Sequence, residues 1–164
     1  MQTLKLNLIA AWFGILLGFG SGLVLGLFFH REDWMGGYTS FKRRLYRLAH
    51  ISFFGLAAVN LFFYLTALRL PASGPAIVIA SWSLIIGAIS MPICCLLLAH
   101  FPRTRLLFSV PVTSLLLGGT LTLATLVRVA NPDFQPAAND SSHFTHPSSE
   151  VLLMKEDQVL KTNR

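Results

Sequence analysis

The apolar residues of this chain fall into four long blocks that are separated by short polar segments. Each block holds more than 20 residues, and none contains Asp, Glu, Lys or Arg. A bilayer core about 30 Å thick is crossed by roughly 20 helical residues, and a helix satisfies its own backbone hydrogen bonds in lipid. The pattern therefore predicts an all-α integral membrane protein, an up-down bundle of four transmembrane helices over residues 6–29, 48–68, 76–99 and 106–127.

The composition agrees with this interpretation and marks where the membrane domain ends. Charged residues make up 12% of the chain, whereas a soluble domain carries about 25%. After residue 128 the sequence becomes polar and rich in proline, as in "NPDFQPAANDSSHFTHPSS". We therefore expect a four-helix transmembrane domain over residues 1–128. Residues 129–164 should form a flexible tail, with a short helix near 149–161.

The net charge of +6 is concentrated in the segments between the blocks. A basic chain can bind nucleic acid, but here the charges flank membrane spans, which excludes that class. The positive-inside rule then places the loops around residues 30–47 and 103–105 in the cytoplasm and both termini on the non-cytoplasmic side, as in a bacterial inner membrane. Those loops carry Arg31, Lys42, Arg43, Arg44, Arg47, Arg103 and Arg105, against Lys5, Arg69 and Arg128 on the other side.

The densest basic cluster precedes the second block in "YTSFKRRLYRL". Lys42, Arg43, Arg44 and Arg47 alternate there with apolar residues at helical spacing. Such a basic amphipathic stretch suits the surface of an anionic leaflet. We therefore predict that these four residues anchor the chain to anionic headgroups.

The first block carries a row of glycines, Gly14, Gly18, Gly22 and Gly26, at intervals of four residues. Residues four apart share a helix face, and small residues on one face let another helix approach closely. The row predicts helix packing, either within the chain or against another chain, with a flat-lying cofactor as the alternative. The fourth block is rich in Ser, Thr and Gly, so we expect the first and fourth helices to pack together.

Three histidines fall at block ends that an up-down bundle brings to one layer: His30, His50 and His100. Imidazole is a common metal ligand and an axial ligand of haem iron. His50 lies deepest and is the best candidate, with either His100 or His30 as its partner, and nearby arginines could pair with haem propionates. The alternative is that all three are ordinary interfacial histidines that bind no cofactor.

Two further groups in the blocks carry polar or soft atoms. Met91, Cys94 and Cys95 lie on one side of the third block, and soft sulfur ligands suit Cu(I), although these residues also serve as packing residues. Asn60 lies in the middle of the second block. Because an amide should not face lipid, we predict a hydrogen bond from Asn60 to hydroxyls of the fourth helix or to Tyr64.

The blocks contain no carboxylate for an ion or proton pathway, and the chain has no Walker loop, GxSxG, HExxH or CxxC motif. We therefore expect a small polytopic membrane protein without intrinsic catalysis. It would act as a subunit or accessory factor that packs, through its glycine-rich helix face, against a membrane-protein partner or a second copy. The alternative function is a membrane electron-transfer protein that binds haem b, or a metal, through its histidines.

Overall fold

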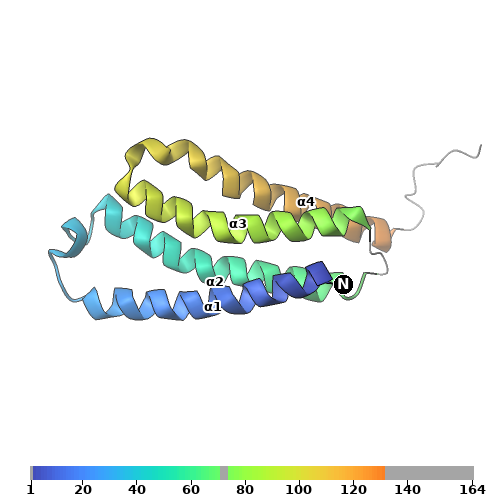
Figure 1. Cartoon of the computed structure of the whole chain (residues 1–164), viewed down its shortest axis with the longest axis horizontal. Coiled ribbons are helices and arrows are strands. Elements are labelled where there is room, and N and C mark those ends of the chain that lie inside the picture. The colour runs from blue at the N-terminus through green and yellow to red at the C-terminus, as the bar shows by residue number, and fades with distance from the viewer. Residues whose placement is uncertain (1, 71–73, 132–164) are drawn as a thin grey trace, which may run out of the picture. The chain divides into compact units, whose positions relative to one another are not determined.

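A computed structural model of the chain describes residues 2–70 and 74–131, and the predicted tail helix near 149–161 lies outside these residues. Four long α-helices follow one another in alternating directions (Figure 1). Two short 3₁₀ segments, η1 and η2, occupy the connections before α2 and α4. The elements are α1 (Gln2–Phe28), η1 (Trp34–Gly36), α2 (Phe41–Ala67), α3 (Pro75–His100), η2 (Pro102–Phe108) and α4 (Ser109–Ala130).

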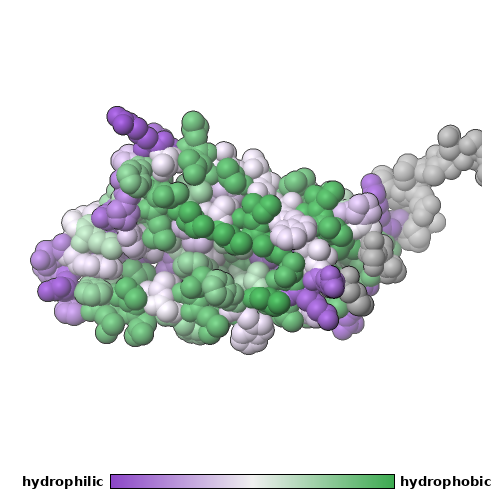
Figure 2. Space-filling model, in the orientation of Figure 1, coloured by the Kyte–Doolittle hydropathy of each residue, from purple (hydrophilic) through white to green (hydrophobic). Residues whose placement is uncertain are grey.

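All four helices are long and apolar enough to cross a membrane, which confirms the predicted all-α integral membrane fold. Figure 2 shows hydrophobic side chains along the middle of the visible face and hydrophilic side chains toward both ends of the helices. This distribution matches an apolar bilayer core between two polar interfaces. We call the end with residues 29–40 and 101–108 the loop end, because it holds the α1–α2 and α3–α4 connections.

The bundle is open, because its helices pack in the order of the sequence. α1 packs on α2, α2 on α3 and α3 on α4, and α1 also makes a smaller contact with α3 (Figure 1). α1 and α4 share no extensive contact, so the predicted pairing of the first and fourth helices was wrong. Gly118 of α4 meets α3 instead, because a Cβ on it would lie 2.8 Å from the Leu84 side chain.

The best-enclosed apolar cluster joins α2 to α3, and it includes Phe63, Ala80 and Leu84. The edge helices bury much less: only Asn7, Ala11 and Gly18 in α1, and Pro111 and Gly118 in α4, are buried. The wide exposed faces of α1 and α4 are apolar, as expected for helices that meet lipid.

α2 begins at Phe41, earlier than the apolar block that predicted it, because the basic stretch is helical and continuous with the span. The Ser40 side chain caps this helix by accepting a hydrogen bond from the Arg43 backbone N–H at 3.2 Å. Just before it the chain turns through Met35, Gly36 and Gly37, which have φ angles of 58°, 83° and 92°. Glycine adopts such angles without a Cβ clash, and this turn folds η1 back over the start of α2.

Candidate functional site

A cavity of about 260 Å³ lies between α1 and α2 at the loop end, and we call it the basic pocket. Its lining contains two arginines and a histidine but no carboxylate. α2 supplies the polar side chains, α1 supplies two glycines and Leu25, and the connection between the two helices supplies Phe29 and Trp34. The lining residues are Gly22, Leu25, Gly26, Phe29, Trp34, Arg43, Arg47 and His50.

Arg43 is the most deeply placed cation of the basic pocket, with 2% of its surface exposed. Its Nη2 donates to the carbonyl oxygen of Phe29 at 2.9 Å, just beyond the end of α1, where a helix has unpaired carbonyls and a negative dipole end. The guanidinium carbon also lies 5.2, 5.8 and 5.0 Å from the ring centroids of Phe29, Trp34 and Tyr38. Arg43 is thus enclosed in an aromatic cage of its own chain, and its predicted contact with anionic headgroups stays a prediction.

The guanidinium of Arg43 keeps hydrogen-bonding capacity beyond these contacts. It has five N–H groups, and within the described residues only Nη2 has an acceptor. In the same part of the chain, every fully enclosed side-chain nitrogen or oxygen has a hydrogen-bond partner. The N–H groups on Nε and Nη1 thus have no acceptor among the described residues, and Arg43 lines the basic pocket.

The other three residues of the basic cluster differ in position. Arg47 is half-buried, lines the pocket, and lies 5.0 Å from the Tyr38 ring centroid. Arg44 is exposed and donates to the carbonyl oxygen of Thr39 at 2.8 and 3.1 Å. Lys42 is half-buried and does not line the pocket. Arg44 and Lys42 thus remain candidates for surface contact with headgroups.

His50 points from α2 toward α1. Its Nδ1 lies 2.9 Å from the Ser21 hydroxyl, and its ring packs edge-on against Phe54. A Cβ on Gly22 would lie 2.8 Å from the imidazole Cε1, so the glycine makes room for this ring. With Nδ1 engaged, Nε2 is the ring nitrogen that remains available for a ligand.

The structure does not gather the three predicted histidines at this pocket. His30 and His100 are exposed and line no part of it. The His100 Nδ1 lies 3.0 Å from the carbonyl oxygen of Leu96, and its ring lies 6.1 Å from that of Tyr46. Among residues 2–70 and 74–131, no three side chains of His, Cys, Asp or Glu lie close enough to hold a metal ion.

Three of the four glycines in the predicted row face α2 of the same chain. A Cβ on Gly14 would lie 3.1 Å from the Ala57 Cβ, and one on Gly18 would lie 2.7 Å from the Phe54 ring. Together with Gly22, these glycines pack against α2: Gly18 is buried, whereas Gly14 and Gly22 are half-buried and each lines a cavity. Gly26 has open space around its Cβ position and borders the basic pocket.

The sulfur residues of α3 lie inside the helix packing near η2. Cys94 and Cys95 are both free thiols and both are buried. The Cys94 Sγ lies 3.4 Å from the carbonyl oxygen of Leu107, and Met91 is half-buried on the same helix.

A buried polar cluster joins α1, α2 and α3 toward the end opposite the loops, and Asn60 is the one member that was predicted to be buried from the sequence. The exposed fractions of Asn7, Asn60 and Ser81 are 0%, 0% and 1%. The Asn7 amide nitrogen donates to the Asn60 Oδ1 at 2.9 Å and to the Ser81 carbonyl at 3.3 Å, and the Ser81 hydroxyl donates back to the Asn7 Oδ1. The predicted partners of Asn60 were therefore wrong. The α4 hydroxyls bond to their own helix backbone, as Thr122 does to Gly118.

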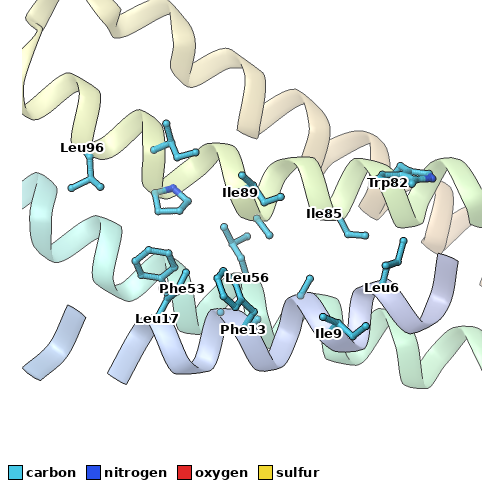
Figure 3. A pocket seen from close by; sticks show the side chains of 16 residues that line it. Leu6, Ile9, Phe13, Leu17, Phe53, Leu56, Trp82, Ile85, Ile89 and Leu96 are labelled. Atoms are coloured by element: carbon cyan, nitrogen blue, oxygen red, sulfur yellow. The ribbon is translucent and has the colours of Figure 1, made fainter. Parts of the chain in front are cut away.

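A second, larger cavity of about 560 Å³ lies between α1, α2 and α3, and we call it the apolar groove (Figure 3). Side chains of α1 such as Leu6 and Phe13 line it opposite Trp82 and Ile89 of α3, and the 16 lining residues are all apolar. Four of them are small: Ala10, Gly14, Ala57 and Ala88.

One backbone group along the apolar groove lacks its usual partner. Pro92 lies inside α3 and lines the groove together with Ala88, four residues earlier. Because proline has no N–H, the Ala88 carbonyl oxygen has no i+4 donor. In lipid such a freed acceptor is normally satisfied by a neighbouring helix, a polar side chain or a water.

The chain matches no protein-family model, no curated protein and no solved structure. Function is therefore argued from the basic pocket, the apolar groove and the membrane-spanning fold.

Proposed function

We propose that this is a non-catalytic integral membrane protein that serves as a subunit or accessory protein of another membrane protein. A transmembrane segment of that partner would pack into the apolar groove. The observation that carries the proposal is the Ala88 carbonyl, an acceptor without its helical donor on the wall of a groove that is otherwise apolar. The proposed partner-binding face is thus the groove, which includes Gly14 of the glycine row.

The groove has features that favour a helix over lipid. Apolar surface alone gives a helix no advantage in a bilayer, because lipid tails are equally apolar. Close approach at small residues and interhelical hydrogen bonds do favour helices. The groove offers the small residues Ala10, Gly14, Ala57 and Ala88, and the Ala88 carbonyl lacks its i+4 donor. Its α3 wall runs from Trp82 to Leu96, about 21 Å at 1.5 Å per residue. We expect the partner segment to carry a hydrogen-bond donor at the depth of Ala88.

The orientation belongs to the same proposal. The loop end carries seven Lys and Arg residues, and the opposite end carries three before the tail. This difference supports a cytoplasmic loop end and termini on the non-cytoplasmic side. The proposal of a bacterial inner membrane rests on this charge bias.

Site-specific photo-crosslinking in the native membrane tests the partner proposal. A photoreactive residue at Ile89, on the groove wall, should give one discrete protein adduct. The same residue at Leu116, on the exposed face of α4, should give none. Ala88→Phe, which fills the groove beside Ile89, should abolish the adduct, and Gly20→Phe, at an open α1 position outside the groove, should keep it.

Three results would count against the proposal. If Ile89 yielded lipid adducts alone, the groove would be a lipid-facing surface. If its adduct were a second copy of this chain, the protein would self-associate instead of serving another protein. If Leu116 gave the same adduct as Ile89, the contact would not be specific to the groove.

A further inference from the structure

We infer that the basic pocket at the loop end holds the phosphate of an anionic membrane lipid. The pocket is distinct from the apolar groove, because the two share no lining residue. The inference therefore stands independently of the partner proposal.

The positive charge of the pocket favours an anionic ligand. Arg43 and Arg47 are one helical turn apart on α2, and both lie 5.0 Å from the Tyr38 ring centroid. No carboxylate lines the pocket to balance them. A cation that is largely removed from water is costly unless an anion or a full set of hydrogen bonds accompanies it. The Phe29 carbonyl and the aromatic rings provide only part of that compensation for Arg43.

The geometry of the pocket suits a phosphate. Arg43, with N–H groups that have no acceptor among the described residues, lines the pocket together with Arg47. His50 adds a ring nitrogen that Ser21 does not engage. Arginine binds phosphate oxygens through charge-assisted hydrogen bonds, often two at a time. Gly22 and Gly26 contribute no side chains. The cavity of about 260 Å³ is several times the ~30 Å³ that one liquid water occupies, so it has room for a phosphate group.

The surroundings of the pocket favour a lipid over free phosphate. Leu25, Phe29 and Trp34 form apolar walls beside the basic groups, and the site lies where α1 ends and α2 begins. An amphiphile has a charged head for the arginines and an apolar body for these walls, whereas inorganic phosphate matches only the arginines. Basic pockets between transmembrane helices at this depth are a recognised form of lipid headgroup site.

Thermal unfolding of the full-length protein in micelles tests the inference. The micelles are doped with phosphatidylglycerol or with phosphatidylcholine, and a third series receives inorganic phosphate. A ligand that binds only the folded state raises the midpoint, and the rise grows as the ligand concentration exceeds its dissociation constant. We expect phosphatidylglycerol to raise the midpoint, and phosphatidylcholine and inorganic phosphate to leave it unchanged at equal concentration.

Two matched pairs of variants locate the effect. Arg47→Gln removes a pocket charge and should weaken the binding of phosphatidylglycerol about tenfold. This factor corresponds to the loss of one charge-assisted contact. Arg44→Gln removes an exposed charge three residues away, outside the pocket, and should weaken the binding far less than Arg47→Gln does. Gly26→Leu fills the pocket without touching its charges and should abolish the shift, while Gly20→Leu, which also has open space around its Cβ, should retain it.

Several outcomes would overturn the inference. An equal loss in Arg44→Gln and Arg47→Gln would show diffuse surface attraction without a site. A full phosphatidylglycerol shift in Gly26→Leu would show that the lipid binds elsewhere. An equal shift from inorganic phosphate would assign the site to a free anion. If Gly26→Leu did not fold, the two arginine variants would still decide the matter.

Discussion

The hydrogen bond between Asn7 and Asn60 should couple α1 to α2 energetically, and a double-mutant cycle can measure that coupling. Asn7 lies at the centre of the buried polar cluster, because its amide donates both to Asn60 and to the backbone of Ser81. Asn7→Ala removes both donors and the acceptor of the Ser81 hydroxyl. It also leaves the Asn60 Oδ1 without its partner in a region that water does not reach.

The expected size follows from these contacts. Interhelical hydrogen bonds in a bilayer contribute about 0.6 kcal/mol on average and up to about 1.7, and a buried polar group left unpaired costs about 1–3 kcal/mol. Asn7→Ala should therefore lower the free energy of unfolding by about 2–4 kcal/mol. Asn60→Ala should cost less, about 1–2 kcal/mol, because Asn7 keeps its bond to the Ser81 carbonyl. The double variant should fall short of the sum by about 0.6–1.7 kcal/mol.

Reversible unfolding in mixed micelles with a rising fraction of SDS, followed by far-UV circular dichroism, measures the free energy of unfolding. The four proteins of the cycle are the wild type, the two single variants and the double variant. Ser90→Ala is the control, because the Ser90 hydroxyl bonds only to the Gly87 carbonyl of its own helix at 3.4 Å. That control should change stability by less than about 0.5 kcal/mol. A coupling energy indistinguishable from zero, or an Asn7→Ala protein as stable as the control, would refute the reasoning.

Three further predictions concern the glycine row, the aromatic cage and the orientation. Gly18→Leu should lower the free energy of unfolding by about 1–3 kcal/mol or more, because even its Cβ would lie 2.7 Å from the Phe54 ring. Equal stability of Gly18→Leu and Gly20→Leu in the same SDS titration would contradict this packing of α1 on α2. Arg43→Gln should speed hydrogen exchange of the backbone amides around residues 34–40 and leave exchange in α3 and α4 unchanged. The reason is that it removes the hydrogen bond to Phe29 and three ring contacts. Unaltered exchange at residues 34–40 would mean that the cage does not order this loop. A topology reporter after Arg164 should read as non-cytoplasmic and one near Gly37 as cytoplasmic, and the reverse pattern would invert the proposed orientation.

The four spans could be predicted from the sequence because the length of an apolar block directly reflects the thickness of the bilayer. The start of α2 could not be predicted in the same way. Charges mark where a helix leaves the apolar core, but they do not end the helix itself. The basic stretch keeps its helical spacing, and Ser40 caps it at the actual start.

The helix pairing could not be predicted, because a face of small residues does not specify which helix it meets. The row on α1 accommodates Ala57, Phe54 and His50 of α2, and Gly118 of α4 accommodates Leu84 of α3. These contacts depend on how each helix is rotated about its axis, which composition alone does not determine.

The candidate site was predicted in part. His50, Arg43 and Arg47 were singled out, but Arg43 was assigned to the membrane surface. Its cage consists of the rings of Phe29, Trp34 and Tyr38, which all belong to the connection between α1 and α2 that turns at Met35–Gly37. Asn7 had a usable signal, since a lone amide within an apolar block should face the protein interior. Its partners, 53 and 74 residues away, could not be identified without the fold.

The central claim is that the loop end holds an anionic lipid, and not the haem that the histidines also suggested. The most direct test is to identify the small molecules that remain bound to the purified protein. Native mass spectrometry of the full-length chain, released gently from its membrane, measures which molecule stays bound. We predict an adduct with the mass of one anionic phospholipid, present in the wild type and in Gly20→Leu and absent in Gly26→Leu. A haem adduct, or a wild-type chain that carries no anionic lipid, would contradict the account.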